Sequence, residues 1–102
     1  MKKHIYKIKQ KVWLYSGVMA SWHFVSIGTQ ISKEIKIGYP FIGRRGFGSV
    51  PVIVTVGKTS WKTSIFPDNK RKTYILPLKK EIRIKENISP NKILSFTLEV
   101  LT

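Results

Sequence analysis

Apolar and polar residues alternate along most of this chain with a period of two, which a β-strand produces and a helix does not. The alternation is clearest over residues 94–100, where Leu, Phe and Val alternate with Ser, Thr and Glu. Over residues 6–14, apolar side chains fall on one face and three lysines on the other. Further strands are expected over residues 22–27, 50–56, 61–66 and 74–76. Six mostly antiparallel strands predict a mainly β fold, a small barrel.

Two segments interrupt this strand pattern. Residues 32–37 are expected to form one or two helical turns, with Ser32 as the N-cap. Residues 77–86 are expected to form a second short helix, because Pro77 is tolerated at a first helical position. Leu78, Ile82 and Lys85 would share one face of that helix, and Asn87 is a suitable end for it.

Length and composition limit the function classes. The 102 residues fit one β-barrel domain over 1–102. The chain has no cysteine, which excludes disulfides, cysteine zinc sites and thiol catalysis. No run approaches the roughly 18 apolar residues of a membrane span, and we expect a cytoplasmic protein with no membrane contact. With 19 basic and 5 acidic residues, the formal net charge of +14 favours a polyanionic partner.

The sequence contains a weak internal repeat. A short apolar strand over 24–27 is followed by Lys-Glu-Ile-Lys-Ile at 33–37. A second short strand over 74–76 is followed by Lys-Glu-Ile-Arg-Ile at 80–84. Such likeness also arises by chance in a chain rich in Lys and Ile, so duplication stays open. A duplicated chain closes one barrel alone, which slightly favours a monomer, although the oligomeric state is not readable.

Four segments carry a resemblance to a known family. They are residues 22–27, Gly48-Ser49-Val50-Pro51-Val52, Trp61-Lys62-Thr63-Ser64-Ile65-Phe66-Pro67 and Tyr74-Ile75-Leu76-Pro77-Leu78-Lys79. At these residues the chain resembles the family called domain of unknown function 1905. The resemblance implies a double-split β-barrel, an architecture also seen in AbrB-like regulators and MazE-like antitoxins. Those regulators use a Pro-x-x-x-x-Arg unit before a short apolar helix and strand, to which residues 77–93 are similar. The family has no established activity.

This chain departs from the family pattern at two turns. Gly28 stands where the family often has Pro, and Asn91-Lys92 stands where it usually has Gly-Asp. Both replacements are residues that turns accept, so the resemblance still implies the same fold.

Nothing in the sequence indicates catalysis. Gly57-Lys58-Thr59 is not a phosphate-binding loop, because Val52 stands where that motif needs Gly, and it is interpreted as a hairpin turn. His4 and His23 have no carboxylate nearby in sequence, and Glu34, Glu81, Glu86 and Glu99 are expected on solvated faces. We therefore expect a non-enzyme with no catalytic residue, no metal ligand and no cofactor.

Two function hypotheses from different classes lead, and an enzyme is the third and least expected, which a buried His23 paired with a carboxylate in a cleft would favour. The first is binding of nucleic acid or another polyanion with weak sequence specificity, mainly through phosphate contacts. The candidate contact residues are Arg44, Arg45, Lys70, Arg71, Lys72, Lys79 and Arg83. The second is a non-catalytic protein-interaction or small-ligand-binding module without a nucleic-acid role. An apolar pocket, or basic charge scattered over all faces, favours the second.

The three tryptophans bear on both hypotheses. Exposed aromatic side chains stack on bases in single-strand binders, whereas a small barrel also needs large residues to fill its interior. Trp22 and Trp61 are expected to pack in the core or at its rim. Trp13 falls on the lysine-bearing face of its strand, so packing is less expected for it.

Overall fold

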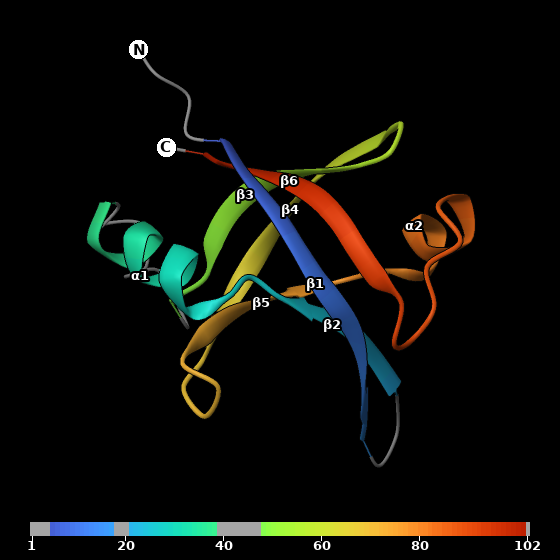
Figure 1. The fold of residues 1–102 in the computed structure, drawn as a ribbon, viewed down its shortest axis with the longest axis horizontal. Coiled ribbons are helices and arrows are strands. Elements are labelled where there is room, and N and C mark those ends of the chain that lie inside the picture. Colours follow the sequence, from blue (N-terminus) through green and yellow to red (C-terminus); the bar gives the residue numbers. More distant parts are fainter. Residues whose placement is uncertain (1–4, 18–20, 39–47, 102) are drawn as a thin grey trace.

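The fold is a closed barrel of six strands with two short helices, in a computed structural model that describes residues 5–17, 21–38 and 48–101 (Figure 1). The strands are β1 (Ile5–Ser16), β2 (Ser21–Ser26), β3 (Val50–Val56), β4 (Thr59–Asp68), β5 (Thr73–Pro77) and β6 (Ile93–Val100). The helices are α1 (Thr29–Gly38) and α2 (Lys80–Lys85). The predicted fold class, a mainly β barrel with short helices, is confirmed.

All strand pairs are antiparallel, and the barrel closes in the order β1-β2-β5-β4-β3-β6. Two long strands, β1 and β4, pair with one neighbour along their first part and with the other neighbour along their last part. β1 pairs with β6 through residues 5–11 and with β2 through residues 12–16. β4 pairs with β3 through residues 59–65 and with β5 through residues 66–68. The barrel wall therefore divides into two parts that meet where β1 and β4 pass from one neighbour to the next.

We name these parts by their outer surfaces. The aromatic wall comprises β2, β5 and residues 12–16 and 66–68. The polar wall comprises β3, β6 and residues 5–11 and 59–65. Alternation turns Val12, Val25 and Leu76 of the aromatic wall into the interior, and Val54 and Leu98 of the polar wall meet them there. All five side chains are fully buried, and each such burial contributes about 1.5–3 kcal/mol.

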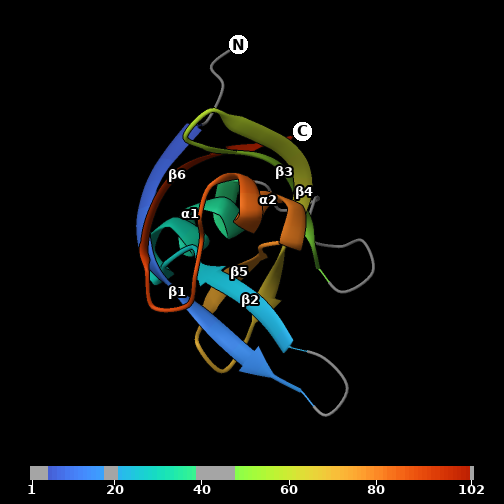
Figure 2. The ribbon, with the colours of Figure 1, turned by 90° about the vertical axis from the view of Figure 1, so that its right-hand side faces the viewer.

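The two helices cover opposite ends of the barrel (Figure 1), and seen from the α2 end the strands encircle them (Figure 2). Ile35 of α1 and Ile82 of α2 are buried members of the hydrophobic core. Each helix thus contributes an isoleucine from the sequence repeat to the closure of one barrel end.

The order of elements occurs twice along the chain, as β1-β2-α1-β3 and as β4-β5-α2-β6. If β1, β2 and β3 are exchanged with β4, β5 and β6, every strand pairing maps onto another pairing of the barrel. Under this exchange β2 pairs with its own counterpart β5, and β3 pairs with its own counterpart β6. At the β2–β5 junction, the backbone N–H of Ile27 donates to the carbonyl of Tyr74 at 2.9 Å. The N–H of Leu78 likewise donates to the carbonyl of His23 at 2.9 Å. The weak sequence repeat corresponds to these two strand–helix units.

The start of α1 differs from the prediction. The helix begins at Thr29, directly after Gly28, whose φ is +102°. Ser32 is therefore inside the helix and is not the N-cap. Its buried hydroxyl accepts a hydrogen bond from the N–H of Tyr74 at 2.9 Å and lies 3.1 Å from the Thr73 hydroxyl. This contact with β5, which sequence spacing does not reveal, explains the buried position of Ser32.

The start of α2 also differs from the prediction, which placed it too early. Pro77 is the last residue of β5, opposite Phe24 of β2, and the helix begins at Lys80 with Lys79 as its N-cap residue. The expected end is close to the observed one, since Asn87 has a positive φ of 53° and Ile88 N–H bonds back to the carbonyl of Arg83 at 2.9 Å. Within the described residues, neither helix has the length and hydropathy to cross a membrane.

Candidate functional site

The outer surface of the aromatic wall carries large apolar side chains instead of polar ones. Since Val12, Val25 and Leu76 point inward, the residues that alternate with them point outward. The outward residues fall opposite one another in the strand register, as Tyr15 with Trp22, Trp13 with Phe24, Phe24 with Pro77, and Phe66 with Ile75.

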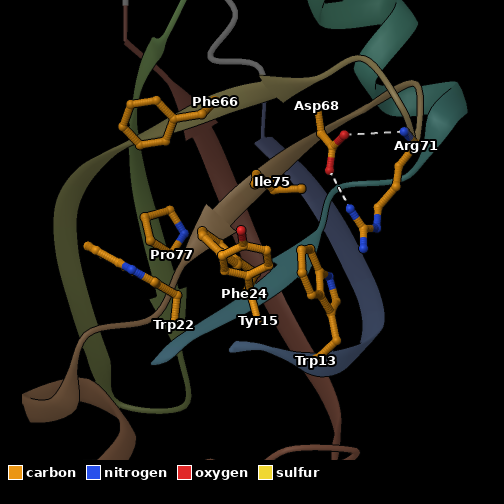
Figure 3. Close-up of a pocket in the computed structure, with 9 residues that line it drawn as sticks. All are labelled: Trp13, Tyr15, Trp22, Phe24, Phe66, Asp68, Arg71, Ile75 and Pro77. Atoms are coloured by element: carbon orange, nitrogen blue, oxygen red, sulfur yellow. Dashed lines mark hydrogen bonds and ion pairs between the residues drawn. The ribbon is translucent and has the colours of Figure 1, made fainter. Parts of the chain in front are cut away.

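These side chains line a pocket of about 450 Å³, here called the aromatic pocket. Its lining residues are Trp13, Tyr15, Trp22, Phe24, Phe66, Asp68, Arg71, Ile75 and Pro77 (Figure 3). The pocket lies on the outside of the barrel, and Trp22 is 53%, Tyr15 55% and Phe66 38% exposed. Its volume is within the range of about 300–1,000 Å³ typical of small-molecule sites.

Three rings follow one another across the floor of the aromatic pocket. The ring centroids of Trp13 and Phe24 are 5.0 Å apart with planes tilted by 36°. Those of Trp22 and Phe24 are 6.3 Å apart with planes 14° from parallel. The Trp13 indole N–H donates to the Ser26 hydroxyl at 3.2 Å, which fixes the orientation of that ring.

One ion pair forms the polar end of the aromatic pocket. Arg71 Nη1 donates to Asp68 Oδ2 at 2.8 Å, and the Arg71 guanidinium carbon lies 4.1 Å from the Trp13 ring centroid. The backbone N–H groups of Lys70 and Arg71 donate to Asp68 Oδ1 at 3.1 and 3.3 Å. Figure 3 shows this pair at one end of the pocket and Trp22 at the other.

The Asp68 carboxyl is held ionised by these contacts. Burial by itself raises the pKa of Asp68, but the hydrogen bonds and charge of Arg71, together with the Lys70 N–H, bring the pKa below its usual value. Asp68 therefore keeps its negative charge at neutral pH and fixes Arg71 over Trp13, where cation–π attraction adds to the ion pair.

The structure distributes the predicted contact residues over two sites. Lys70, Arg71 and Lys72 form the turn before β5, whereas Lys79 and Arg83 follow β5 on the other side. Because β5 runs through the aromatic pocket, the two basic groups flank it at opposite ends of that strand. Arg71 is the only one of these five residues that lines the pocket.

Arg83 is the least available of these residues. Its side chain is half-buried, and its Nε donates to the carbonyl of Leu78 at 3.1 Å. Three positions from the sequence analysis, Arg44, Arg45 and His4, lie outside the described residues.

Other basic side chains are spread over the barrel. Lys7, Lys9 and Lys11 are exposed along β1, on the face that continues into Trp13 and Tyr15. Lysines 33 and 36 are exposed on α1 and Lys58 on the β3–β4 turn. The described surface therefore has no single basic face, although the three lysines of β1 lie in a row that ends beside the aromatic pocket.

The expected packing of the tryptophans is half correct. Trp61 is partly buried against the core, as predicted. Trp22 does not pack in the core or at its rim. Val25 points into the barrel, so Trp22 on the opposite face of β2 points to the outer surface. Phe24 and Phe66 were not expected at a site. The position of Trp13 on the lysine-bearing face of its strand was the one signal in the sequence that pointed outward.

Two ionisable side chains outside the aromatic pocket, His23 and Glu86, are partly buried. His23 lies on the face of β2 that is turned to the barrel interior. Burial and the positive charge of Arg83 lower the pKa of His23, and its Nδ1 has no hydrogen-bond partner among the described residues. Glu86 is not on a solvated face as predicted, since it is half-buried and its Oε2 accepts the Thr59 hydroxyl at 2.7 Å. In the described part of the chain, no three His, Cys, Asp or Glu side chains lie close enough to hold a metal ion.

Comparison with known proteins places the whole barrel in one sequence family. A family model described as a domain of unknown function (DUF1905) matches residues 9–98, which include both helices and all but the ends of the first and last strands. A search of the curated proteins finds no match to this chain.

Proposed function

Since the chain belongs to the DUF1905 family, to which no activity is assigned, we propose a function from the site itself: the protein binds single-stranded nucleic acid with weak sequence specificity. One observation carries this proposal. An exposed aromatic pocket lies on the outer face of the sheet, between two groups of basic residues at the ends of β5.

Aromatic side chains on an open sheet surface suit unpaired bases. Each base has a flat π-face, and stacking on an aromatic side chain contributes about 1–3 kcal/mol per base with little preference for sequence. Trp22, Phe24 and Trp13 present adjoining rings over more than one base width, as their centroid separations of 6.3 and 5.0 Å indicate. Paired bases in a duplex are already stacked, so the pocket favours single strands.

The charges supply the contacts to the backbone. A strand lying on the aromatic pocket meets Lys70, Arg71 and Lys72 at one end of β5 and Lys79 at the other. The lysines of β1 extend the same outer surface beyond Trp13. Such contacts are made to phosphate and carry no sequence information, which agrees with a net charge of +14.

The repeated order of elements supports a double-split barrel, the architecture that AbrB-like regulators share. This analogy of fold raises the expectation of a nucleic-acid partner and cannot replace the argument from the site. We propose that the protein acts by binding, without catalysis, and in the cytoplasm. We also propose that it is a monomer, because one chain closes the barrel.

The proposal is tested by titrating a labelled random single strand of about 12 nucleotides, within the footprint of roughly 4–16 nucleotides typical of sheet-based binders. Anisotropy is measured at several salt concentrations, with the matching duplex in parallel. We expect tighter binding to the single strand and a salt slope of about −0.7 per phosphate contacted. Absence of binding at low salt, or binding that does not change with salt, refutes the proposal.

A second candidate is supported by the lining of the aromatic pocket, where Asp68 and Arg71 are the only charged side chains among the described residues. A non-catalytic module for a small apolar ligand or a protein partner, without a nucleic-acid role, would use the same surface. The scattered lysines agree with it. Salt-independent binding of a neutral planar aromatic compound, with no binding of the single strand, favours this candidate.

A further inference from the structure

We propose that the aromatic pocket and Arg71 together form a site for one nucleoside phosphate, with the base in the pocket and the phosphate on the guanidinium. This inference rests on the proposed function and names the unit of the strand that the site holds. It goes further, because it assigns the contact with phosphate to Arg71 and the positioning of Arg71 to Asp68.

Arg71 is oriented before any ligand arrives. Its guanidinium is fixed on one side by the 2.8 Å ion pair to Asp68 and on one face by the Trp13 ring at 4.1 Å. Only Nη1 is used in a hydrogen bond with Asp68, so other N–H groups of the guanidinium remain for an anion. The Arg71 side chain is 50% exposed, which leaves this edge open to solvent.

Asp68 acts as a positioning residue for Arg71. Its own side chain is 14% exposed, and its two oxygens accept from Lys70 N–H, Arg71 N–H and Arg71 Nη1. The carboxylate is thus occupied by the turn that carries Arg71 and repels an incoming phosphate less than a free carboxylate would. A guanidinium in a planar fork matches phosphate oxygens bidentately.

The rest of the aromatic pocket suits a base. Trp22, Phe24 and Phe66 surround a mainly apolar space, and among the described lining residues the Asp68–Arg71 pair forms its charged end (Figure 3). A ligand that fills this space needs a flat apolar part and an anionic group at one end. A nucleoside phosphate has both parts, and the surrounding positive charge of Lys70 and Lys72 complements its charge.

The test uses adenosine 5′-monophosphate and adenosine as probes and tryptophan fluorescence as the signal. A Trp61→Phe background removes the tryptophan that packs against the core, so that the signal comes from Trp13 and Trp22. We expect the phosphate-bearing probe to bind about tenfold more tightly than adenosine, the size of a hydrogen bond to a charged group.

Four variants separate the roles. Arg71→Ala should abolish the tenfold preference for the phosphate, and Arg71→Lys should restore only part of it. Asp68→Asn should reduce the preference through Arg71, whereas Trp22→Ala should weaken both probes equally by about five- to 150-fold. Lys58→Ala removes one positive charge on the β3–β4 turn, outside the pocket lining, and serves as the matched control.

The outcomes distinguish this inference from the proposed function. Equal affinity for the two probes, or a preference that survives Arg71→Ala, overturns the phosphate role of Arg71. Absence of quenching by either probe overturns the pocket site, even if the labelled single strand still binds through its phosphates. If the single strand also fails to bind, both proposals are wrong. Thermal unfolding of each variant is measured as a control, to check that the barrel is intact.

Discussion

The aromatic wall and the polar wall share one interior but have different outer surfaces. Inside, both contribute Val and Leu side chains that are fully buried. Outside, the polar wall shows Lys9, Thr55, Ser95 and Thr97, whereas the aromatic wall shows tryptophan and phenylalanine rings. The described outer residues of the polar wall include no aromatic ring, although Ile5 and Ile93 are exposed there. This difference between the outer surfaces agrees with the proposed binding role of the rings on the aromatic wall.

The largest effect should come from the interior, and it should be the same in both walls. Leu76→Ala in the aromatic wall and Leu98→Ala in the polar wall each remove a side chain with no exposed surface. Each change should lower the free energy of unfolding by about 2–5 kcal/mol, from lost burial and a residual cavity. Urea denaturation measures both. A loss below about 1 kcal/mol in either variant would show that its leucine contributes little to the common core.

The next effect separates the two outer surfaces. Trp22→Ala should cost about 1–3 kcal/mol of binding free energy for the single strand through a lost stack. Its effect on unfolding should be about 1 kcal/mol or less, because the side chain is more than half exposed. Anisotropy and urea denaturation measure the two quantities.

The matched control for Trp22 is Ser95→Ala, on the outer face of β6 in the polar wall, where the side chain is exposed. Neither binding nor stability should change by more than about 0.5 kcal/mol. If Trp22→Ala destabilises the barrel strongly and leaves binding intact, the outer rings serve the fold, and the contrast between the walls loses its functional meaning.

A smaller effect is expected at the turn of the polar wall. Gly57 has a φ of +56°, and a Cβ there would meet the Glu86 carboxylate, which accepts the Thr59 hydroxyl. Gly57→Ala should therefore lower stability by about 1–2 kcal/mol. Lys58→Ala, in the same turn, should change it by less than about 0.5 kcal/mol. Single-strand binding should be unaffected in both, since the turn does not line the aromatic pocket.

The smallest effect concerns pH and His23 in the aromatic wall. Burial and Arg83 lower the pKa of His23, so the unfolded chain binds a proton more readily than the folded one. Stability is then complete above about pH 6.5 and decreases as pH falls through the lowered pKa of the folded state. Urea denaturation at about pH 7.5 and about pH 5.5 measures this decrease. His23→Leu should reduce it, and an unchanged pH dependence in that variant would contradict the assignment.

Alternation made the strands predictable, because a half-exposed strand in this barrel has to separate apolar from polar residues. Residues 94–100 show this, and their pattern gave β6 almost to the residue. The order in which strands pair was not predictable, since contacts such as Val25 with Leu76 join residues far apart in sequence. The first residues of the two helices were predicted wrongly for the same reason. Ser32 has the side chain of an N-cap, but its partner Thr73 lies across the fold.

The candidate site was only partly predictable. In β2, Trp22 and Phe24 alternate with Val25 and Ile27, and all four are apolar, so periodicity could not tell the inner face from the outer. In β1, the same face carries lysines before Trp13, and the outward direction was readable. The stack of Arg71 on Trp13 joins a turn to a distant strand, which no local pattern indicates.

The pairing of β1 with β6 has a consequence for how this protein is made. Ile5 lies opposite Glu99, so β1, the first strand of the barrel to leave the ribosome, waits for β6, which follows the other five strands in the chain. Until then β1 has an unpaired edge, of the kind that pairs with other chains. Such distant pairing also slows folding, because the closure entropy comes before the contacts that offset it. Barrel closure therefore has to wait until β6 has been made, and until then the unpaired edge of β1 is open to pairing with other chains.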